Sequence, residues 1–160
     1  MKSLLSNPIF ILIVRVFLGG LFVVSSLDKI IYPEAFTVSI LNYKVVDETF
    51  AILTATTLPW LELICGFLLI IGVYSRTSAL ILTTLLMGFT ILIVSALIRG
   101  LDISCGCFTQ DPNAEKIGYR KILENVGFIL MGVYLVFAKV EGITLLQVLR
   151  KKSDFPPSLS

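Results

Sequence analysis

Two cysteines one residue apart are the side chains of this sequence best suited to chemistry. Cys105 and Cys107 flank Gly106 in the polar stretch Leu101–Thr109, which separates two apolar runs. A disulfide between residues this close reaches the required Cα separation but strains the S–S torsion. Strained disulfides are the easily reduced, catalytic or regulatory ones, and glycine allows the backbone bend at little cost. The pair therefore predicts thiol–disulfide chemistry.

Two other interpretations of the pair remain open, namely two structural thiols or half of a metal site. The sequence has no histidine and a third cysteine, Cys65, 40 positions before Cys105. A closed four-ligand zinc site would thus need a second molecule, and we expect no metal. Arg99 and Lys116 favour a thiolate in the loop, whereas Asp102 opposes one. We expect Cys65 to be a small packing residue.

The composition places these cysteines in a membrane protein. Hydrophobic residues make up 56% of the 160 residues, charged residues 15%, and the mean hydropathy is +0.95. These values indicate several membrane spans, so the lipid bilayer is the first expected partner. A net charge of +2 gives no reason to expect a nucleic-acid partner. Nucleotide-binding and serine-hydrolase motifs are absent from the sequence.

The pattern of apolar runs predicts an all-α fold, a polytopic membrane four-helix bundle in a single domain. The expected spans are about 9–27, 49–74, 79–98 and 118–138, each long enough to cross a bilayer. Arg15 interrupts the first run and no cleavage site follows, which favours a retained helix over a secretory signal. The cysteine loop is 99–117, and the tail 150–160 is expected to be mobile.

The first loop and the third span carry two further patterns. Pro33 suits a helix start, and Phe36, Ile40 and Tyr43 follow at helical spacing. This predicts a short helix on the membrane surface, with an ordered loop packed on the bundle as the alternative. In the third span the small or mildly polar face should allow close helix approach; it consists of Thr84, Gly88, Ile91 and Ser95.

Charged residues inside the spans need partners, because an arginine at membrane depth costs about 2.5–3.5 kcal/mol. Arg15 and Glu62 are predicted to pair across antiparallel first and second spans, with snorkelling of Arg15 to the interface as the alternative. Lys29 continues the polar stripe of the first span, which is formed by Arg15, Gly19, Phe22, Ser26 and Lys29. Asn125 is expected to hydrogen-bond across helices at the edge of the fourth span.

Glu62 has both a structural and a functional interpretation. Buried ion pairs, or a protonated carboxyl, often serve only to fix helix packing. An intramembrane carboxyl is also a candidate proton site or a contact for a quinone or a lipid headgroup. Glu62, Cys65 and Gly66 share one face of the second span, so either role would be played in the helix interface.

The orientation follows weakly from the positive charges. Four spans put both termini on one side and the two longer loops on the other, and lysines and arginines outside the spans number six on each side. The cluster Arg150, Lys151 and Lys152 favours cytoplasmic termini. The cysteine loop would then lie outside the cytoplasm, in the periplasm or extracellular space, where disulfides persist.

These residues resemble the DoxX-like superfamily of four-helix membrane proteins and, within it, the MauE family. The superfamily's arginine, glycine and Ser-x-x-Lys in the first span, and its Pro-x-x-Glu-x-x-x-Gly in the second, are matched by Arg15, Gly19, Ser26, Lys29, Pro59, Glu62 and Gly66. The more specific Cys-Gly-Cys-Phe-Gly loop is matched by Cys105, Gly106, Cys107 and Phe108, with Thr109 in place of the last glycine.

The resemblance implies a bacterial inner-membrane protein linked to thiol–disulfide chemistry outside the cytoplasm. Its partner would be a thioredoxin-like or disulfide-containing protein, and methylamine metabolism is implied by family only. Cys105 and Cys107 would exchange disulfides, with Arg15, Lys29 and Glu62 forming a polar interior beside which a quinone is the candidate cofactor. If the protein is an enzyme, it is a thiol–disulfide or quinone-linked oxidoreductase. The alternatives are a non-catalytic scaffold or assembly subunit, and a lipid- or small-molecule-binding bundle built on Arg15 and Glu62.

Overall fold

The structure is a computed structural model that describes residues 8–101 and 119–138. Cys105, Cys107 and the tail 150–160 lie outside these residues. The described chain forms five helices, α2 (Pro8–Ile31), α3 (Pro33–Asn42), α4 (Glu48–Ile71), α5 (Ser75–Ile98) and α6 (Tyr119–Phe137). No strand occurs within these ranges, and the all-α prediction is confirmed.

Three of the described helices, α2, α4 and α5, are long and apolar enough to cross a membrane. Each has 24 residues and is therefore about 36 Å long, more than the roughly 30 Å of a bilayer's hydrocarbon core. The protein is thus a multi-pass membrane protein. The helix α6 has 19 residues and begins with a charged turn containing Arg120 and Lys121. That α6 also crosses the membrane stays a prediction.

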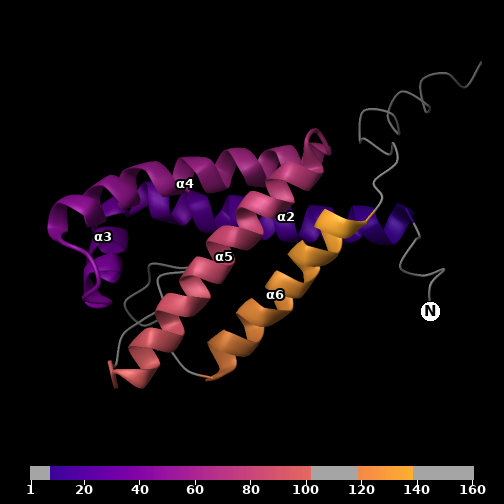
Figure 1. The fold of residues 1–160 in the computed structure, drawn as a ribbon. Coiled ribbons are helices and arrows are strands. Elements are labelled where there is room, and N and C mark those ends of the chain that lie inside the picture. Colours follow the sequence, from indigo (N-terminus) through magenta and orange to yellow (C-terminus); the bar gives the residue numbers. More distant parts are fainter. Residues whose placement is uncertain (1–7, 102–118, 139–160) are drawn as a thin grey trace, which may run out of the picture.

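The long helices pack as two pairs that cross obliquely (Figure 1). The helix α2 lies along α4, and α5 lies along α6; contacts of α4 with α5 and of α2 with α6 join the pairs. Each long helix contributes at least one leucine to the same buried cluster, namely Leu18, Leu69, Leu82, Leu86 and Leu135. These apolar contacts hold the two pairs together.

Small residues let α2 and α4 approach closely. A Cβ atom on Gly19 would lie 2.7 Å from Cγ1 of Ile70 and 2.8 Å from the carbonyl oxygen of Gly66. A Cβ on Gly66 would lie 3.1 Å from the carbonyl oxygen of Gly19. The backbones themselves are therefore in contact, as small residues permit between membrane helices. This contact accounts for the glycines in the polar stripe of α2 and on the face of α4 that carries Glu62.

The connections are shorter and more helical than the sequence indicates. The helix α5 begins at Ser75 rather than near 79, so a three-residue turn, 72–74, reverses the chain. Gly72 (φ +90°) and Tyr74 (φ +49°) adopt left-handed conformations in this turn. The first loop contains the helix α3, with Pro33 in its first turn and Phe36 buried. It packs on α4 and α2, and its position on the membrane surface stays a prediction.

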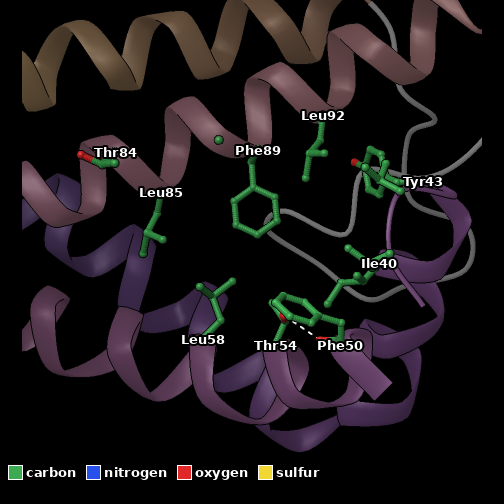
Figure 2. Close-up of a pocket in the computed structure, with 12 residues that line it drawn as sticks. Ile40, Tyr43, Phe50, Thr54, Leu58, Thr84, Leu85, Phe89 and Leu92 are labelled. Carbon is green, nitrogen blue, oxygen red and sulfur yellow. Dashed lines mark hydrogen bonds between the residues drawn. The ribbon is translucent and has the colours of Figure 1, made fainter. Parts of the chain in front are cut away.

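The predicted packing face of the third span is wrong. Thr84, Gly88 and Ile91 on α5 are exposed and Ser95 is half-buried, whereas another face of α5, which mixes small and large side chains, is buried. It consists of Ser75, Ser78, Ala79, Leu82, Thr83, Leu86, Ile93 and Ala96. The exposed small residues Thr84 and Gly88 instead line an apolar groove of about 280 Å³ between α3, α4 and α5 (Figure 2).

Candidate functional site

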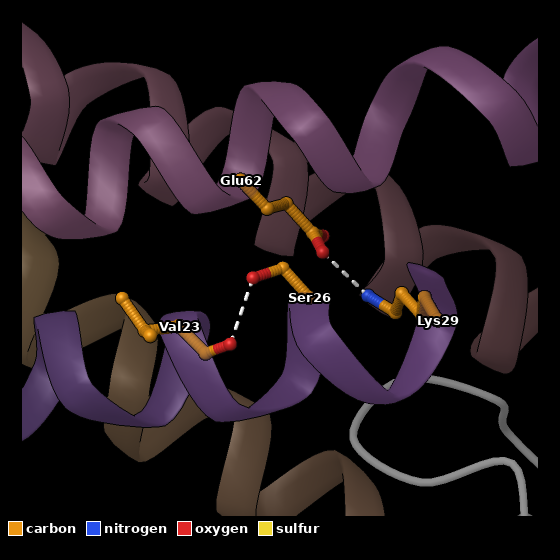
Figure 3. A network of polar contacts seen from close by, with 4 residues as sticks. All are labelled: Val23, Ser26, Lys29 and Glu62. Carbon is orange, nitrogen blue, oxygen red and sulfur yellow. Dashed lines mark hydrogen bonds and ion pairs between the residues drawn. The ribbon is translucent and has the colours of Figure 1, made fainter. Parts of the chain in front are cut away.

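A buried ion pair joins α2 and α4 at the centre of the candidate site. The Nζ atom of Lys29 lies 2.7 Å from Oε2 of Glu62, and each side chain is 1% exposed. Lys29 belongs to the last turn of α2 and Glu62 to the middle of α4, and the two side chains point toward one another (Figure 3). Charges at this depth are stable when they are paired and hydrogen-bonded.

Aromatic rings close the site around the ammonium group of Lys29. Its Nζ atom is 5.1 Å from the ring centroid of Phe36 on α3 and 5.2 Å from that of Phe89 on α5. Both distances are within the range of cation–π attraction. Ser26, also fully buried, donates its hydroxyl to the carbonyl oxygen of Val23 at 2.8 Å (Figure 3). Four helices therefore contribute to a sealed polar site.

The predicted Arg15–Glu62 pair is wrong. Arg15 donates from Nε to the carbonyl oxygen of Leu69 at 3.1 Å and from Nη2 to that of Ile70 at 3.3 Å. Its side chain is 1% exposed, and its guanidinium lies beside Gly72, where α4 ends; that Arg15 reaches the membrane interface stays a prediction. Antiparallel packing places Arg15 against the last turn of α4, about two turns or 11 Å along that helix from Glu62. Lys29 is the cation at the depth of Glu62.

The last turn of α4 is a suitable partner for a buried cation. Its carbonyl groups lack intrahelical donors and form the negative end of the helix dipole. Gly72 ends the helix with a φ of +90°, and a Cβ atom there would collide with the guanidinium of Arg15. Glycine is therefore required at this position for two reasons. Gly72 and the two aromatic residues Phe36 and Phe89 are members of the site that sequence reasoning missed.

Asn125 is placed differently from the prediction. Its side chain is 1% exposed, and neither amide atom has a hydrogen-bond partner in the described part of the chain. The expected bond across helices is therefore not seen there. Glu124 contacts Lys121 at 3.0 Å and Arg120 at 3.8 Å along the same helix. As predicted, ordinary pairing on the surface of α6 accounts for Glu124.

The cysteines fall into two groups. Cys65 is a free, 4% exposed thiol in the apolar core, consistent with a packing role. It lies toward the end of α4 that adjoins the 72–74 turn, whereas the segment 102–118 joins the opposite end of α5 to α6. Within 8–101 and 119–138 no three histidine, cysteine or acidic side chains gather as a metal site. Cys105 and Cys107 lie outside these ranges.

Comparison with known proteins identifies similar chains. A family model described as "Methylamine utilisation protein MauE" matches residues 7–138, a range that includes all five helices and the cysteine loop. No solved structure matches the chain. The match ends at 138 and leaves the tail 139–160 outside.

Three proteins named methylamine utilization protein MauE are similar over most of the chain. The protein from Methylophilus methylotrophus is 25% identical over 88% of this chain and 75% of its own length. The protein from Paracoccus denitrificans is 28% identical over 79% of this chain and 68% of its own length. The protein from Methylorubrum extorquens is 30% identical over 80% of this chain and 69% of its own length.

Proposed function

The chain belongs to the MauE family, and from this premise we propose that it supports thiol–disulfide exchange, or the maturation of extracytoplasmic proteins, through Cys105 and Cys107. The observation that carries the proposal is the Cys-Gly-Cys sequence in the connection between α5 and α6. Elsewhere the sequence has one other cysteine, Cys65, which is buried in the core. The reactive thiols are therefore those of the loop.

The exchange step needs only the two loop thiols and a partner disulfide. A thiolate at Cys105 or Cys107 attacks the partner's S–S bond and forms a mixed disulfide, and one partner thiol is released. The second loop thiolate attacks the mixed disulfide, which closes the Cys105–Cys107 disulfide and releases the second partner thiol. Two electrons and two protons pass from the loop to the partner. The reverse sequence oxidises a partner dithiol.

The described helices act as the rigid support of this loop. Lys29 and Glu62 are bonded to each other, and Arg15 is bonded to α4. These contacts favour the structural role of the buried charges over a proton site. They also remove the basis for a binding bundle built on an Arg15–Glu62 pair. A quinone as the final electron acceptor stays a prediction; among the described residues, Asn125 has the buried polar atoms free to bind such a headgroup.

Orientation is part of the proposal. Lys29 was counted with the loop-side charges, but it is buried and paired with Glu62. Arg76 on the side of the termini likewise lies within the span α5, so the lysines and arginines outside the spans number five on each side. The cluster Arg150, Lys151 and Lys152 therefore supports cytoplasmic termini and a cysteine loop outside the inner membrane. An oxidising compartment is where a protein disulfide persists.

Thiol labelling of whole cells tests the position and state of the pair. A membrane-impermeant maleimide is added with and without prior mild reductant, and mass spectrometry assigns the label. We expect labelling of Cys105 and Cys107 only after reduction, and none of Cys65 under either condition. Labelling without reductant would show free thiols and contradict the resting disulfide. No labelling at all would contradict the extracytoplasmic position.

Trapping of mixed disulfides tests the exchange itself. In Cys105→Ser or Cys107→Ser, the second thiol that would resolve the mixed disulfide is missing. At least one single variant should therefore accumulate a reductant-sensitive adduct with its partner. Wild type, the double variant and Cys65→Ser should not accumulate it. If no adduct forms and the double variant supports partner maturation like wild type, the non-catalytic scaffold is the correct function.

Methylamine utilisation is a second candidate function because the three relatives carry that name. Deletion of the gene should then prevent growth of the source organism with methylamine as nitrogen source and leave growth with ammonium unchanged. Restoration by wild type but not by the Cys105→Ser/Cys107→Ser variant would join the two proposals. Normal growth of the deletion strain on methylamine would exclude the pathway and leave thiol exchange to be judged by trapping.

A further inference from the structure

The apolar groove follows the axes of two membrane helices. On α4 its wall is formed by Phe50, Thr54 and Leu58, and on α5 by Leu92, Phe89, Gly88, Leu85 and Thr84 (Figure 2). Both walls repeat about every four residues, so the groove runs along the helices for about two turns, or 12 Å. Ile40 of α3, together with Tyr43, Val45 and Val46, closes one end.

The depth of the groove corresponds to one leaflet. It starts near Glu48, where α4 begins, and reaches Leu58 near the middle of that helix. On α5 it runs from Leu92, near the C-terminal end, back to Thr84 near the middle. Because both helices are long enough to span a bilayer, a groove from one end to the middle covers about half of the roughly 30 Å hydrocarbon thickness.

The lining recognises hydrocarbon rather than polar groups. The Thr54 hydroxyl donates to the carbonyl oxygen of Phe50 at 2.8 Å, and that of Thr84 donates to Leu80 at 2.9 Å. Both hydroxyls are thus satisfied within their own helices. Burial raises the pKa of Tyr43 to about 12, and its neutral phenol stands at the end of the groove that Ile40, Val45 and Val46 also form. Between the walls of α4 and α5, a headgroup would lose its hydrogen bonds to water without replacement.

The inner wall of the groove borders the buried ion pair. Phe89 lines the groove on one side, and its ring lies 5.2 Å from Nζ of Lys29 on the other. Beside it, a Cβ atom on Gly88 would have no neighbour within 4 Å. Hydrocarbon in this space would contact Phe89 and complete the apolar surroundings of the Lys29–Glu62 pair.

Two cations lie at the outer end of the groove. Lys44 is exposed and makes no ion pair among the described residues, and Arg99 is exposed and donates from Nη1 to the carbonyl oxygen of Tyr43 at 2.9 Å. Asp47 and Glu48 are also there, but they stand at the N-terminal end of α4, where the helix dipole compensates negative charge. Lys44 and the remaining N–H groups of Arg99 can therefore face a phosphate.

We propose that the groove binds one acyl chain of a membrane phospholipid, with the phosphate beside Lys44 and Arg99. The lipid belongs to the leaflet on the side of the 43–47 segment. This site differs from the buried charges and from the cysteine loop, so the proposal stands independently of thiol exchange. The bound chain acts as a fourth wall of the groove, beside α3, α4 and α5.

Photocrosslinking tests the site directly. The full chain is placed in vesicles of phosphatidylcholine and phosphatidylglycerol that contain a phospholipid with a diazirine midway along one acyl chain. After illumination, adducts mapped by mass spectrometry should concentrate on Phe50, Leu58 and Phe89. Gly88→Phe should place its ring in the groove, because a Cβ atom there meets nothing within 4 Å, and should abolish these adducts. Gly127→Phe is the matched control, because Gly127 on α6 also faces open space but does not line the groove.

Native mass spectrometry supplies a second measurement. Wild type and Gly127→Phe should retain a phospholipid mass after mild detergent extraction, Gly88→Phe should lose it, and Lys44→Gln should retain less of it. Adducts spread evenly over all lipid-facing residues, or unchanged in Gly88→Phe, would overturn the proposal. A retained isoprenoid mass, or a dimer without lipid, would also overturn it by showing a different occupant.

Discussion

The interface between α2 and α4 holds a buried cation at each end, and the two cations are stabilised in different ways. Arg15 donates to the carbonyl oxygens of Leu69 and Ile70, whereas Lys29 pairs with the carboxylate of Glu62. A planar guanidinium suits two neighbouring carbonyls, and an ammonium is a compact point charge. Removal of the cation would therefore leave different groups behind. Neutral carbonyl dipoles would remain at the Arg15 end, and the buried charge of Glu62 would remain at the Lys29 end.

Removing Lys29 should have the largest effect. Lys29→Met leaves the Glu62 carboxylate buried without its partner, and breaking a buried pair in this way costs about 3–5 kcal/mol. The free energy of unfolding in detergent micelles, titrated with a denaturing detergent, measures the loss. Lys29→Met/Glu62→Met should regain most of it because no charge is left behind. A double variant as unstable as Lys29→Met would show that the loss does not come from the unpaired charge of Glu62.

Widening the middle of the interface should disturb both ends at once. In Gly19→Ala the new methyl group meets Cγ1 of Ile70 and the carbonyl oxygen of Gly66, and overpacking of this kind costs about 1–3 kcal/mol. The neighbouring Gly20 faces open space, so Gly20→Ala should be neutral or stabilising by up to about 1 kcal/mol. Equal effects of the two substitutions in the same unfolding titration would contradict the close backbone approach.

Removing Arg15 should cost less than removing Lys29. Arg15→Met leaves the last-turn carbonyls of α4 without these donors, for which about 1–2 kcal/mol is expected. The same unfolding titration gives the value, and Arg15→Lys should recover only part of it because an ammonium cannot reproduce the forked donation. A loss as large as that of Lys29→Met would refute the difference between the two ends.

The smallest expected effect separates two demands on Gly72. Gly72→Ala must adopt a positive φ and also displaces the Arg15 guanidinium, whereas Gly100→Ala has a positive φ and open space around it. The positive φ costs both variants a free energy of unfolding of order 1 kcal/mol. The clash with Arg15 should cost Gly72→Ala about 1 kcal/mol in addition, so it should be the less stable of the two. In an Arg15→Met background this excess should disappear. If the excess persisted in that background, the additional destabilisation by Gly72→Ala would not come from the contact with Arg15.

Local patterns predicted the faces of α2 and α4 but not how they meet. Arg15, Lys29 and Glu62 were each recognised as buried polar residues, because a stripe at helical spacing identifies one face. The wrong pair was chosen because spacing along a helix does not state its offset against a neighbour. Arg15 lies only two turns into α2, and that position is the available signal that it faces the end of α4 rather than its middle.

The face of α5 shows a second limit of pattern reading. Thr84 and Gly88 form a small-residue face, which often marks helix contact, yet here that face is exposed and hollow. Whether a row of small residues meets another helix or leaves a groove depends on what lies opposite. The residues opposite come from α3 and α4, and no local feature of α5 specifies them.

The sequence by itself determined the helical, membrane-embedded character of the chain and the positions of its apolar runs. These follow from residue type and short-range spacing, because hydrophobicity is a property of each side chain. Thiol–disulfide exchange at Cys105 and Cys107 stays a prediction. The tertiary structure alone decided that Lys29, not Arg15, neutralises Glu62, that Gly72 makes room for Arg15, and that Phe36 and Phe89 enclose the ammonium. Each depends on the offset between helices, which is set by the sum of many packing contacts.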